Sequence, residues 1–379
     1  RIFVAVFLVV SGLSVTGLFT GWERTLLDAR FRLRGPLPVN PAIVHVDIDT
    51  DALKAEGTWN VWTGARHATV INILKRLGVA AFGMDIFFTE RGERSISLQK
   101  LKATGRPQFS FADLERLVPD GMNIFCAAMR NAGFVVLSQL FEDEPEYEKY
   151  DYYRENRKQS LAMQQGRSII DLPAALSRVQ ARSNITPVLA DYAQAAAATG
   201  FAQVIPDPDG VVRRYPLFFR LKDKVYASLG LMTTLVARGL SMADYDPAST
   251  ARLVVFRKGT NELRIPLRED GSLYVNWRGG LRDSHPHISY SAIKWLGYGI
   301  VLREMKAILA RVGEDALFDR ERFLQLPEVV ALTREFGDGT PLAGPLALRA
   351  IDRDSASIVE EVWNRLLLAV LVQKMLDEK

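Results

Sequence analysis

The chain has 379 residues, 48% of them hydrophobic and 24% charged, and a formal net charge of +4 at pH 7. These values exclude a disordered chain and are typical of one large globular domain or two ordinary ones. Nucleic-acid binding uses clustered basic side chains, so this near-balanced charge predicts no nucleic-acid partner. The single cysteine, Cys126, excludes an intramolecular disulfide framework and any multi-cysteine metal site, and its apolar segment predicts that it is buried.

The beginning of the chain has the composition of a membrane helix. Residues 2–20 contain no charged side chain, and their number nearly matches the roughly 20 residues that cross a bilayer. Trp22 then stands where an interfacial aromatic side chain is expected. We therefore expect a retained transmembrane helix; a signal peptide is the alternative, but no convincing cleavage site precedes Trp22. The arginines that follow, up to Arg34, favour a cytoplasmic downstream side, but the orientation stays open without the other flank.

Two apolar strands with a helix between them are predicted next. After a short basic helix at 22–35, residues 43–48 and 79–88 are predicted strands, and 64–77 is a predicted helix between them. This order is typical of neighbouring parallel strands joined by a crossover. In α/β folds, sites lie at the carboxyl ends of parallel strands. Four carboxylates are therefore expected near one edge: Asp47, Asp49, Asp85 and Glu90.

The remaining segments predict a mixed α/β fold, in which antiparallel hairpins follow the parallel start and helices flank the sheet. Residues 207–210, Asp-Pro-Asp-Gly, are a strong turn signal that predicts a hairpin of strands 201–205 and 211–221. Gly200 is expected to end an alanine-rich helix at 188–199. Further helices are predicted at 111–117, 122–131, 228–238, 290–309, 320–336 and 355–376, and further strands at 134–141, 253–257, 262–266 and 272–277.

The tyrosine-rich residues 142–168 have no clear periodicity. They are predicted to form a solvated loop between core elements. The alternative is a binding lid that presents an adhesive face made of Tyr147, Tyr150, Tyr152 and Tyr153.

The aspartates and a tryptophan pair are the candidate site residues. Asp47 and Asp49 alternate in a strand and point the same way, which suits a ligand or cation site shared with Asp85. The alternative is that these carboxylates cap helices or pair with arginines. Trp59 and Trp62 precede Arg66 and His67 and either line a small-molecule pocket or pack the helix start against the sheet.

Evidence for catalysis is weak. The chain has no G-x-S-x-G elbow, no Walker loop and no well-placed G-x-G-x-x-G. His285 and His287 alone are thin support for zinc. We therefore expect a protein that is not an enzyme in this part of the chain, with no cofactor and no bound metal.

An ordered series of segments resembles the CHASE type-two family, the second class of cyclase- and histidine-kinase-associated sensory extracellular domains. The series is LLDARFRLRG after the apolar start, then IVHVDID, ARHATVINILKRLG, AAFGMDIFFTE and NIFCAAMRNAGFVVL. It continues with TGFAQVIPDPDGVVRRYPLFFRL, ASLGLMTTLVAR, SLYVNWRGG and HPHISYSAI. The resemblance covers roughly residues 20–295, and its specificity lies in the order of the segments.

The resemblance implies an extracytoplasmic sensor anchored in the bacterial inner membrane, with most of the chain in the periplasm. Together with the apolar start, it implies a transmembrane helix at 1–20 and a sensory domain at 21–295. The chain departs from the family pattern in its long inserts near 91–120 and 142–185 and in a helical C-terminal region at 296–379. Family-motif positions are Asp47, Asp49, Arg66, Asp85, Asp209, Gly210 and Arg213. Family members feed output cyclases or kinases, and no such domain is seen in this sequence.

Three functions are therefore weighed. The first is a membrane-anchored sensory module that binds a small-molecule cue or a partner protein and transmits the signal by conformational change, as a homodimer or with other envelope proteins. The second is a structural scaffold of an envelope complex, which would use Trp363 and residues 366–371 as an exposed pairing surface. The third is a metal-dependent hydrolase that uses Asp47, Asp49, Asp85 and His67.

Overall fold

The computed structural model describes residues 3–4, 7, 11–12, 18–57, 59, 62–90, 108, 110, 120–142, 151–280, 285–336 and 358–377. Most of the expected membrane helix, the predicted helix at 111–117, and Tyr147 and Tyr150 lie outside these residues. Within the described ranges, no helix combines the length and apolar character needed to cross a membrane.

The chain divides into two compact units, one of residues 1–47 with 275–289 and one of residues 48–274 with 290–379. In the first unit, helix α2 (Leu18–Arg34) ends before Gly35, whose φ of 71° is left-handed. An extended segment follows, in which the Leu37 amide donates to the Arg278 carbonyl. Strand β1 (His45–Asp47) then pairs in parallel with β12 (His287–Ser289).

The predicted pairing of the strand at 43–48 with the strand at 79–88 is wrong. Strand β1 has only three residues and pairs with β12, which lies about 240 positions further along the chain. Strand β2 (Phe82–Phe87) instead pairs with β3 (Val135–Gln139), and helix α7 (Gly121–Ala132) makes the crossover. A parallel strand–helix–strand unit is present, but it joins β2 to β3 rather than β1 to β2. Strands β2 and β3 are longer than β1, and β3 is wholly buried.

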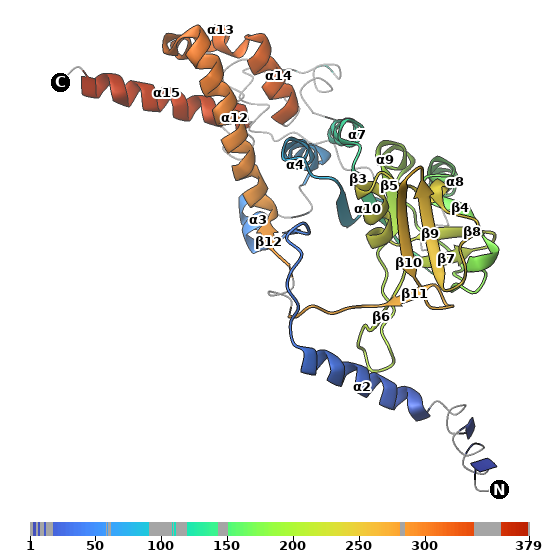
Figure 1. The fold of residues 1–379 in the computed structure, drawn as a ribbon. Helices are drawn as coiled ribbons and strands as arrows, with labels where there is room; N and C mark the ends of the chain where they lie inside the picture. The colour runs from blue at the N-terminus through green and yellow to red at the C-terminus, as the bar shows by residue number, and fades with distance from the viewer. Residues whose placement is uncertain are drawn as a thin grey trace. The chain divides into compact units, whose positions relative to one another are not determined.

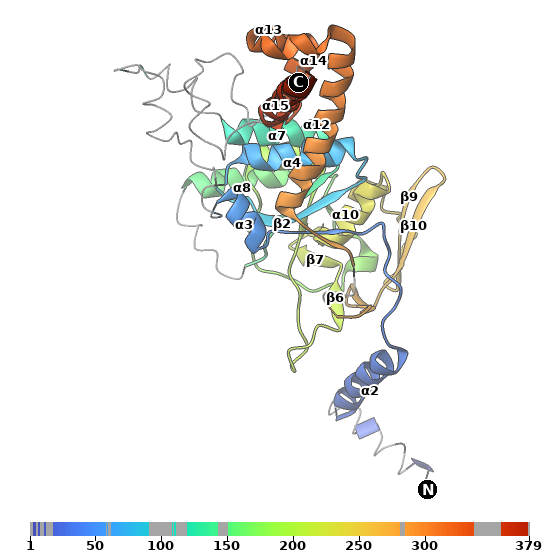
Figure 2. The same cartoon turned by 90° about the vertical axis from the view of Figure 1, so that its left-hand side faces the viewer.

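A parallel sheet is the centre of the second unit (Figure 1), with the order β2-β3-β5. Strand β5 comprises Ala198–Phe201. Helices α4 (Gly64–Arg76) and α7 pack side by side (Figure 2), and α9 (Ala190–Ala195) contacts α7. Helix α10 (Leu229–Ala237) packs against all three strands of the sheet. Cys126 of α7 is buried as predicted, and burial raises the pKa of its thiol to about 11. The sheets and the helices packed against them confirm the predicted α/β fold class.

Gly200 does not end a helix, as the sequence suggested, but lies inside β5. A Cβ atom at this position would stand 2.7 Å from the backbone of Leu229, at the start of α10. The glycine therefore serves close helix–strand packing rather than helix termination. The predicted hairpin of 201–205 with 211–221 is also wrong, because β5 pairs with β3, and β6 (Arg214–Pro216) pairs with β11 (Ser272–Tyr274).

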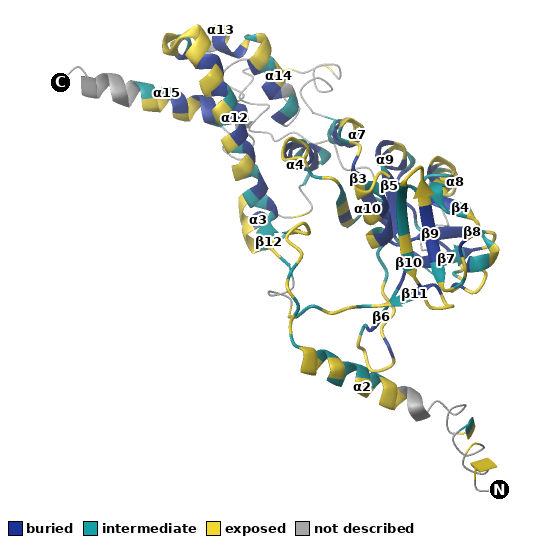
Figure 3. Cartoon of the chain, viewed as in Figure 1, coloured by how far each residue is buried: buried dark blue, intermediate teal, exposed yellow. Residues whose placement is uncertain are grey.

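A second, antiparallel sheet continues the core in the order β4-β8-β7. Successive side chains of its strands point to opposite faces of the sheet. Phe218 and Val225 pack into the cluster under α10, whereas Phe219 and Tyr226 pack with Phe141 on the opposite face. Figure 3 shows the resulting concentration of buried residues in these strands. The bounds are β4 (Ile169–Asp171), β7 (Phe218–Leu221) and β8 (Lys224–Ala227), followed by the hairpin β9 (Leu253–Lys258) and β10 (Asn261–Pro266).

The tyrosine-rich insert is not the loop that its composition predicted, because residues 151–164 form helix α8 (Asp151–Gln164). One face of this helix is buried and polar. The Ser160 hydroxyl donates to the Val188 carbonyl at 2.7 Å, and the Gln164 amide oxygen accepts from the Thr199 hydroxyl at 2.7 Å. These buried hydrogen bonds stabilise a helix that the hydrophobic pattern does not reveal.

Helices complete the second unit, as predicted from residue 290 onward. Helix α12 (Tyr290–Val312) passes uninterrupted through residue 295, and it packs against α4, α14 and α15. The other elements are α3 (Thr50–Glu56), α13 (Arg320–Leu324), α14 (Pro327–Phe336), α15 (Ile358–Asp377) and the 3₁₀ turns η3 (Ala174–Leu176), η4 (Met242–Asp244) and η5 (Glu314–Phe318).

Two glycines allow α4 and α7 to start in contact, and this contact yields a prediction. A Cβ on Gly64 would lie 2.2 Å from the Gly121 carbonyl oxygen. Gly64→Ala should therefore lower the free energy of unfolding by about 1–3 kcal/mol through overpacking. Gly299→Ala is the matched control, because a Cβ there meets nothing within 4 Å and glycine weakens a helix interior. Urea unfolding should show opposite signs for the two variants; equal signs would contradict this account.

Candidate functional site

His67 of α4 is the centre of a buried aromatic cluster. Its ring is only 3% exposed, and its Nδ1 atom lies 2.8 Å from the Tyr290 hydroxyl at the start of α12. The rings of Trp59 and Trp62 stand 5.8 and 5.9 Å from the imidazole, and Phe125 of α7 stands 5.4 Å from it. The hydrogen bond and ring contacts thus join α4, α7 and α12 around one imidazole.

Burial keeps His67 neutral. Burial and, to a smaller extent, the positive charge of neighbouring Arg66 together lower the pKa of the imidazole from 6.5 to about 4. Arg66 itself is half-buried on the same helix. A neutral imidazole can either donate to or accept from the Tyr290 hydroxyl, so the bond persists with either tautomer.

The tryptophan pair covers this cluster, as one of the two sequence readings expected. The two indoles lie 5.1 Å apart, and the Trp62 Nε1 atom donates to the Gly57 carbonyl at 2.8 Å. Trp62 is half-buried, whereas Trp59 is 43% exposed. The pair therefore packs the helix start and also presents an aromatic face to solvent. Trp59, Trp62 and His67 come together as the sequence suggested; Tyr290 was not foreseen.

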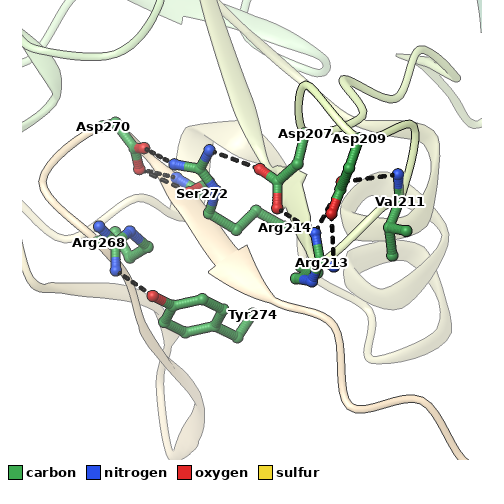
Figure 4. A network of polar contacts seen from close by, with 9 residues as sticks. All are labelled: Asp207, Asp209, Val211, Arg213, Arg214, Arg268, Asp270, Ser272 and Tyr274. Atoms are coloured by element: carbon green, nitrogen blue, oxygen red, sulfur yellow. Dashed lines mark hydrogen bonds and ion pairs between the residues drawn. The ribbon is translucent and has the colours of Figure 1, made fainter. Parts of the chain in front are cut away.

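A second polar centre surrounds Arg213, which precedes β6 (Figure 4). Arg213 and Asp207 are each only 4% exposed, and Nη1 of Arg213 lies 3.0 Å from Asp207 Oδ2. Nη2 of the same guanidinium lies 2.8 Å from Asp209 Oδ2. These hydrogen bonds from Arg213 lower the pKa of Asp209 to about 2. Gly210, with a φ of 80°, completes the turn that brings both carboxylates back to the arginine.

Arg214 extends the network to a second turn. Its guanidinium reaches Asp207 Oδ1 at 2.9 Å and Asp270 Oδ2 at 3.5 Å, and the Ser272 hydroxyl donates to Asp270 at 2.6 Å (Figure 4). The 207–210 turn is thereby held to the turn before β11. Sequence reasoning singled out Asp209 and Arg213 but missed Asp207 and Arg214, although both belong to the same D-P-D-G-x-x-R-R run. These ion pairs hold two turns of the chain together, and the network of Asp207, Asp209, Arg213, Arg214 and Asp270 is called the clamp below.

Comparison with known proteins matched the family model described as "CHASE2 domain" to residues 4–311. The chain belongs to the CHASE2 domain family. CHASE2 domains are extracytoplasmic sensory domains, and the resemblance found in the sequence is thus confirmed. The match extends beyond the expected 20–295 and includes almost all of α12. Searches of curated proteins and of solved structures found no match.

The carboxylates of this CHASE2 domain have separate local roles. Asp49 accepts a hydrogen bond from the Ala52 amide at 2.8 Å and caps α3, which is the helix-capping alternative. Asp47, in the first unit, lies 2.7 Å from Nδ1 of His287. Asp85 is exposed on β2, and Glu90 is exposed just after it. Within the described ranges, no group of three His, Cys, Asp or Glu side chains is placed to hold a metal ion.

Proposed function

We propose that this CHASE2 domain is a membrane-anchored extracytoplasmic sensory module that binds a cue or partner and transmits it by conformational change. The observation that carries the proposal is the family match over residues 4–311. The uncharged residues 2–20 support the anchor, because they have the length of a membrane span.

The aromatic cluster supplies a physical route for the signal. A cue that contacts the exposed face of Trp59 would act on Trp62 and His67, and His67 bonds directly to the first residue of α12. A ligand that prefers one arrangement of these rings shifts the population toward that arrangement. A membrane sensor with one anchoring helix would work as a homodimer or with envelope partners.

The scaffold alternative loses one of its two motivating observations, the exposed helical end, and keeps the long inserts. Trp363 and Leu366, which were expected to form an exposed pairing surface, are buried; Leu368 is exposed. Helix α15 packs against α12 and α14 of its own chain. The hydrolase alternative relied on Asp47, Asp49, Asp85 and His67, but Asp49 caps a helix and His67 is enclosed by aromatic rings.

Topology reporters test the proposed location. Alkaline phosphatase fused after Lys379 of the full chain should be active in bacterial cells, because it folds only outside the cytoplasm, and a green fluorescent protein fused there should stay dark. The fusion should also sediment with membranes and resist alkaline carbonate. A second pair of fusions, with residues 2–20 deleted, is the control and should reverse both readouts. A fluorescent, soluble full-length fusion would contradict the proposal.

A further inference from the structure

Three of the four histidines in the chain form a cluster in the first unit. His45 of β1 and His287 of β12 are a registered strand pair, and their rings stack 4.8 Å apart at 12°. His285, two residues before His287, places its ring 5.5 Å from that of His45. Sequence reasoning considered only His285 and His287, because His45 lies about 240 positions away from them.

Among the residues that the structure describes, one carboxylate pairs with an imidazole of this cluster. Asp47 pairs with His287 at 2.7 Å. Partial burial and the neighbouring His287 and His285 lower the pKa of His45, while Asp47 opposes them. Nδ1 of His285 is buried and has no hydrogen-bond partner in the described part of the chain. Protonation of all three rings would therefore bring like charges close together, with Asp47 as the counter-charge among the described residues.

Two arginines of this unit donate hydrogen bonds away from the cluster. Arg34 of α2 donates to the Asn276 side chain, and Arg278 donates to the Pro38 carbonyl. Within the described residues, no group of three His, Cys, Asp or Glu side chains is placed to hold a metal ion. His45 and His287 are exposed to solvent, which gives protons direct access.

The strand pair that carries the cluster is short, and both strands end where the chain passes into the second unit. The pair has only three registered positions, and a two-stranded pair alone is marginally stable in water. Strand β1 ends at Asp47 and β12 ends at Ser289, and both are the last residues before the chain passes into the second unit. Separation of these strands would therefore change the backbone at two of the points where the chain passes from one unit into the other.

We propose that His45, His285 and His287 form a proton-sensing site, in which acidification charges the cluster and opens the β1–β12 pair. The inference deepens the proposed sensory function, on which it rests, by naming the proton as a cue. Asp47, which lies 2.7 Å from Nδ1 of His287, offsets part of the positive charge, and the repulsion grows as more rings of the cluster become charged.

Hydrogen exchange of the full chain in lipid nanodiscs, with chelator present, tests this site. After correction for intrinsic exchange, amide protection in β1 and β12 should fall at least tenfold from pH 7.5 to pH 5, while protection in β3 stays constant. The triple variant His45→Gln, His285→Gln, His287→Gln should show no such fall. Asp47→Asn should open further than the wild type at pH 5, because it removes the counter-charge.

Unchanged wild-type protection, or an equal fall in the triple variant, would overturn the proposal. Greater protection at pH 7.5 on addition of Zn²⁺ would also overturn it, by marking a metal site instead. The topology result is independent of these outcomes. A domain found outside the cytoplasm whose strand pair ignores pH would keep its sensory function and lose this cue. A domain found in the cytoplasm whose strand pair opens in acid would keep the response to protons and lose the proposed extracytoplasmic sensory function.

Discussion

Arg213→Met should lower the free energy of unfolding by about 3 kcal/mol, because it leaves the buried Asp207 carboxylate without its most buried partner. The value is at the low end of the range for breaking a buried ion pair, because Arg214 still reaches Asp207. Chemical unfolding at pH 7 measures the loss. Tryptophan fluorescence should report the main unfolding transition. Methionine is the substituting residue because it keeps most of the apolar volume of the arginine side chain.

Two further variants separate the buried charge from a general effect of arginine removal. Arg252→Met removes an exposed pair with Glu269, in which the arginine side chain is 79% exposed, and should change stability by less than about 1 kcal/mol. Adding Asp207→Asn to Arg213→Met should recover part of the loss, since the amide carries no charge. Equal losses at Arg213 and Arg252, or no recovery in the double variant, would show that the clamp contributes little.

Acid should destabilise the second unit by about 3 kcal/mol through His67 alone, because its pKa is lowered from 6.5 to about 4. In the unfolded chain His67 takes up a proton near pH 6.5, whereas in the folded chain it stays neutral until about pH 4. Its contribution to stability is therefore complete above pH 6.5, decreases as the pH falls from 6.5 to 4, and has no further slope below that. Urea unfolding as a function of pH measures this slope.

His67→Gln is the matched variant, because its amide can still bond to the Tyr290 hydroxyl but does not titrate. It should have lower stability at pH 7 and a pH slope smaller by up to one proton between pH 6.5 and 4. The triple glutamine variant of His45, His285 and His287 should keep the slope of His67. A wild-type slope that survives in His67→Gln would assign the titration to other groups.

The sequence predicted the local elements better than their partners. Helix α4 and helix α7 were placed within one residue at most termini, because their apolar spacing and the glycine after α7 are local signals. Strand β1 was expected beside β2, but its partner β12 is about 240 residues away, and nothing in a three-residue strand specifies a distant partner. Helix α8 was missed because its buried face is polar.

The candidate site was predictable to the same limited degree. Trp59, Trp62 and His67 are close in sequence and pack together, as their spacing suggested. The Tyr290 partner is 223 positions away from His67 and follows only from the fold. Asp209 and Arg213 came from the family resemblance, whereas the burial of Asp207, which makes the clamp costly to break, is a property of packing.

Helix α12 follows β12 without an intervening residue, since Ser289 ends the strand and Tyr290 begins the helix. Its 23 residues make a rod roughly 35 Å long. Such a rod is a lever arm: a tilt of about 6° at its first turn moves its last turn by roughly 3–4 Å. A displacement at Tyr290 that is too small to disturb the core thus becomes, at Val312, about as large as the distance between two side chains in contact.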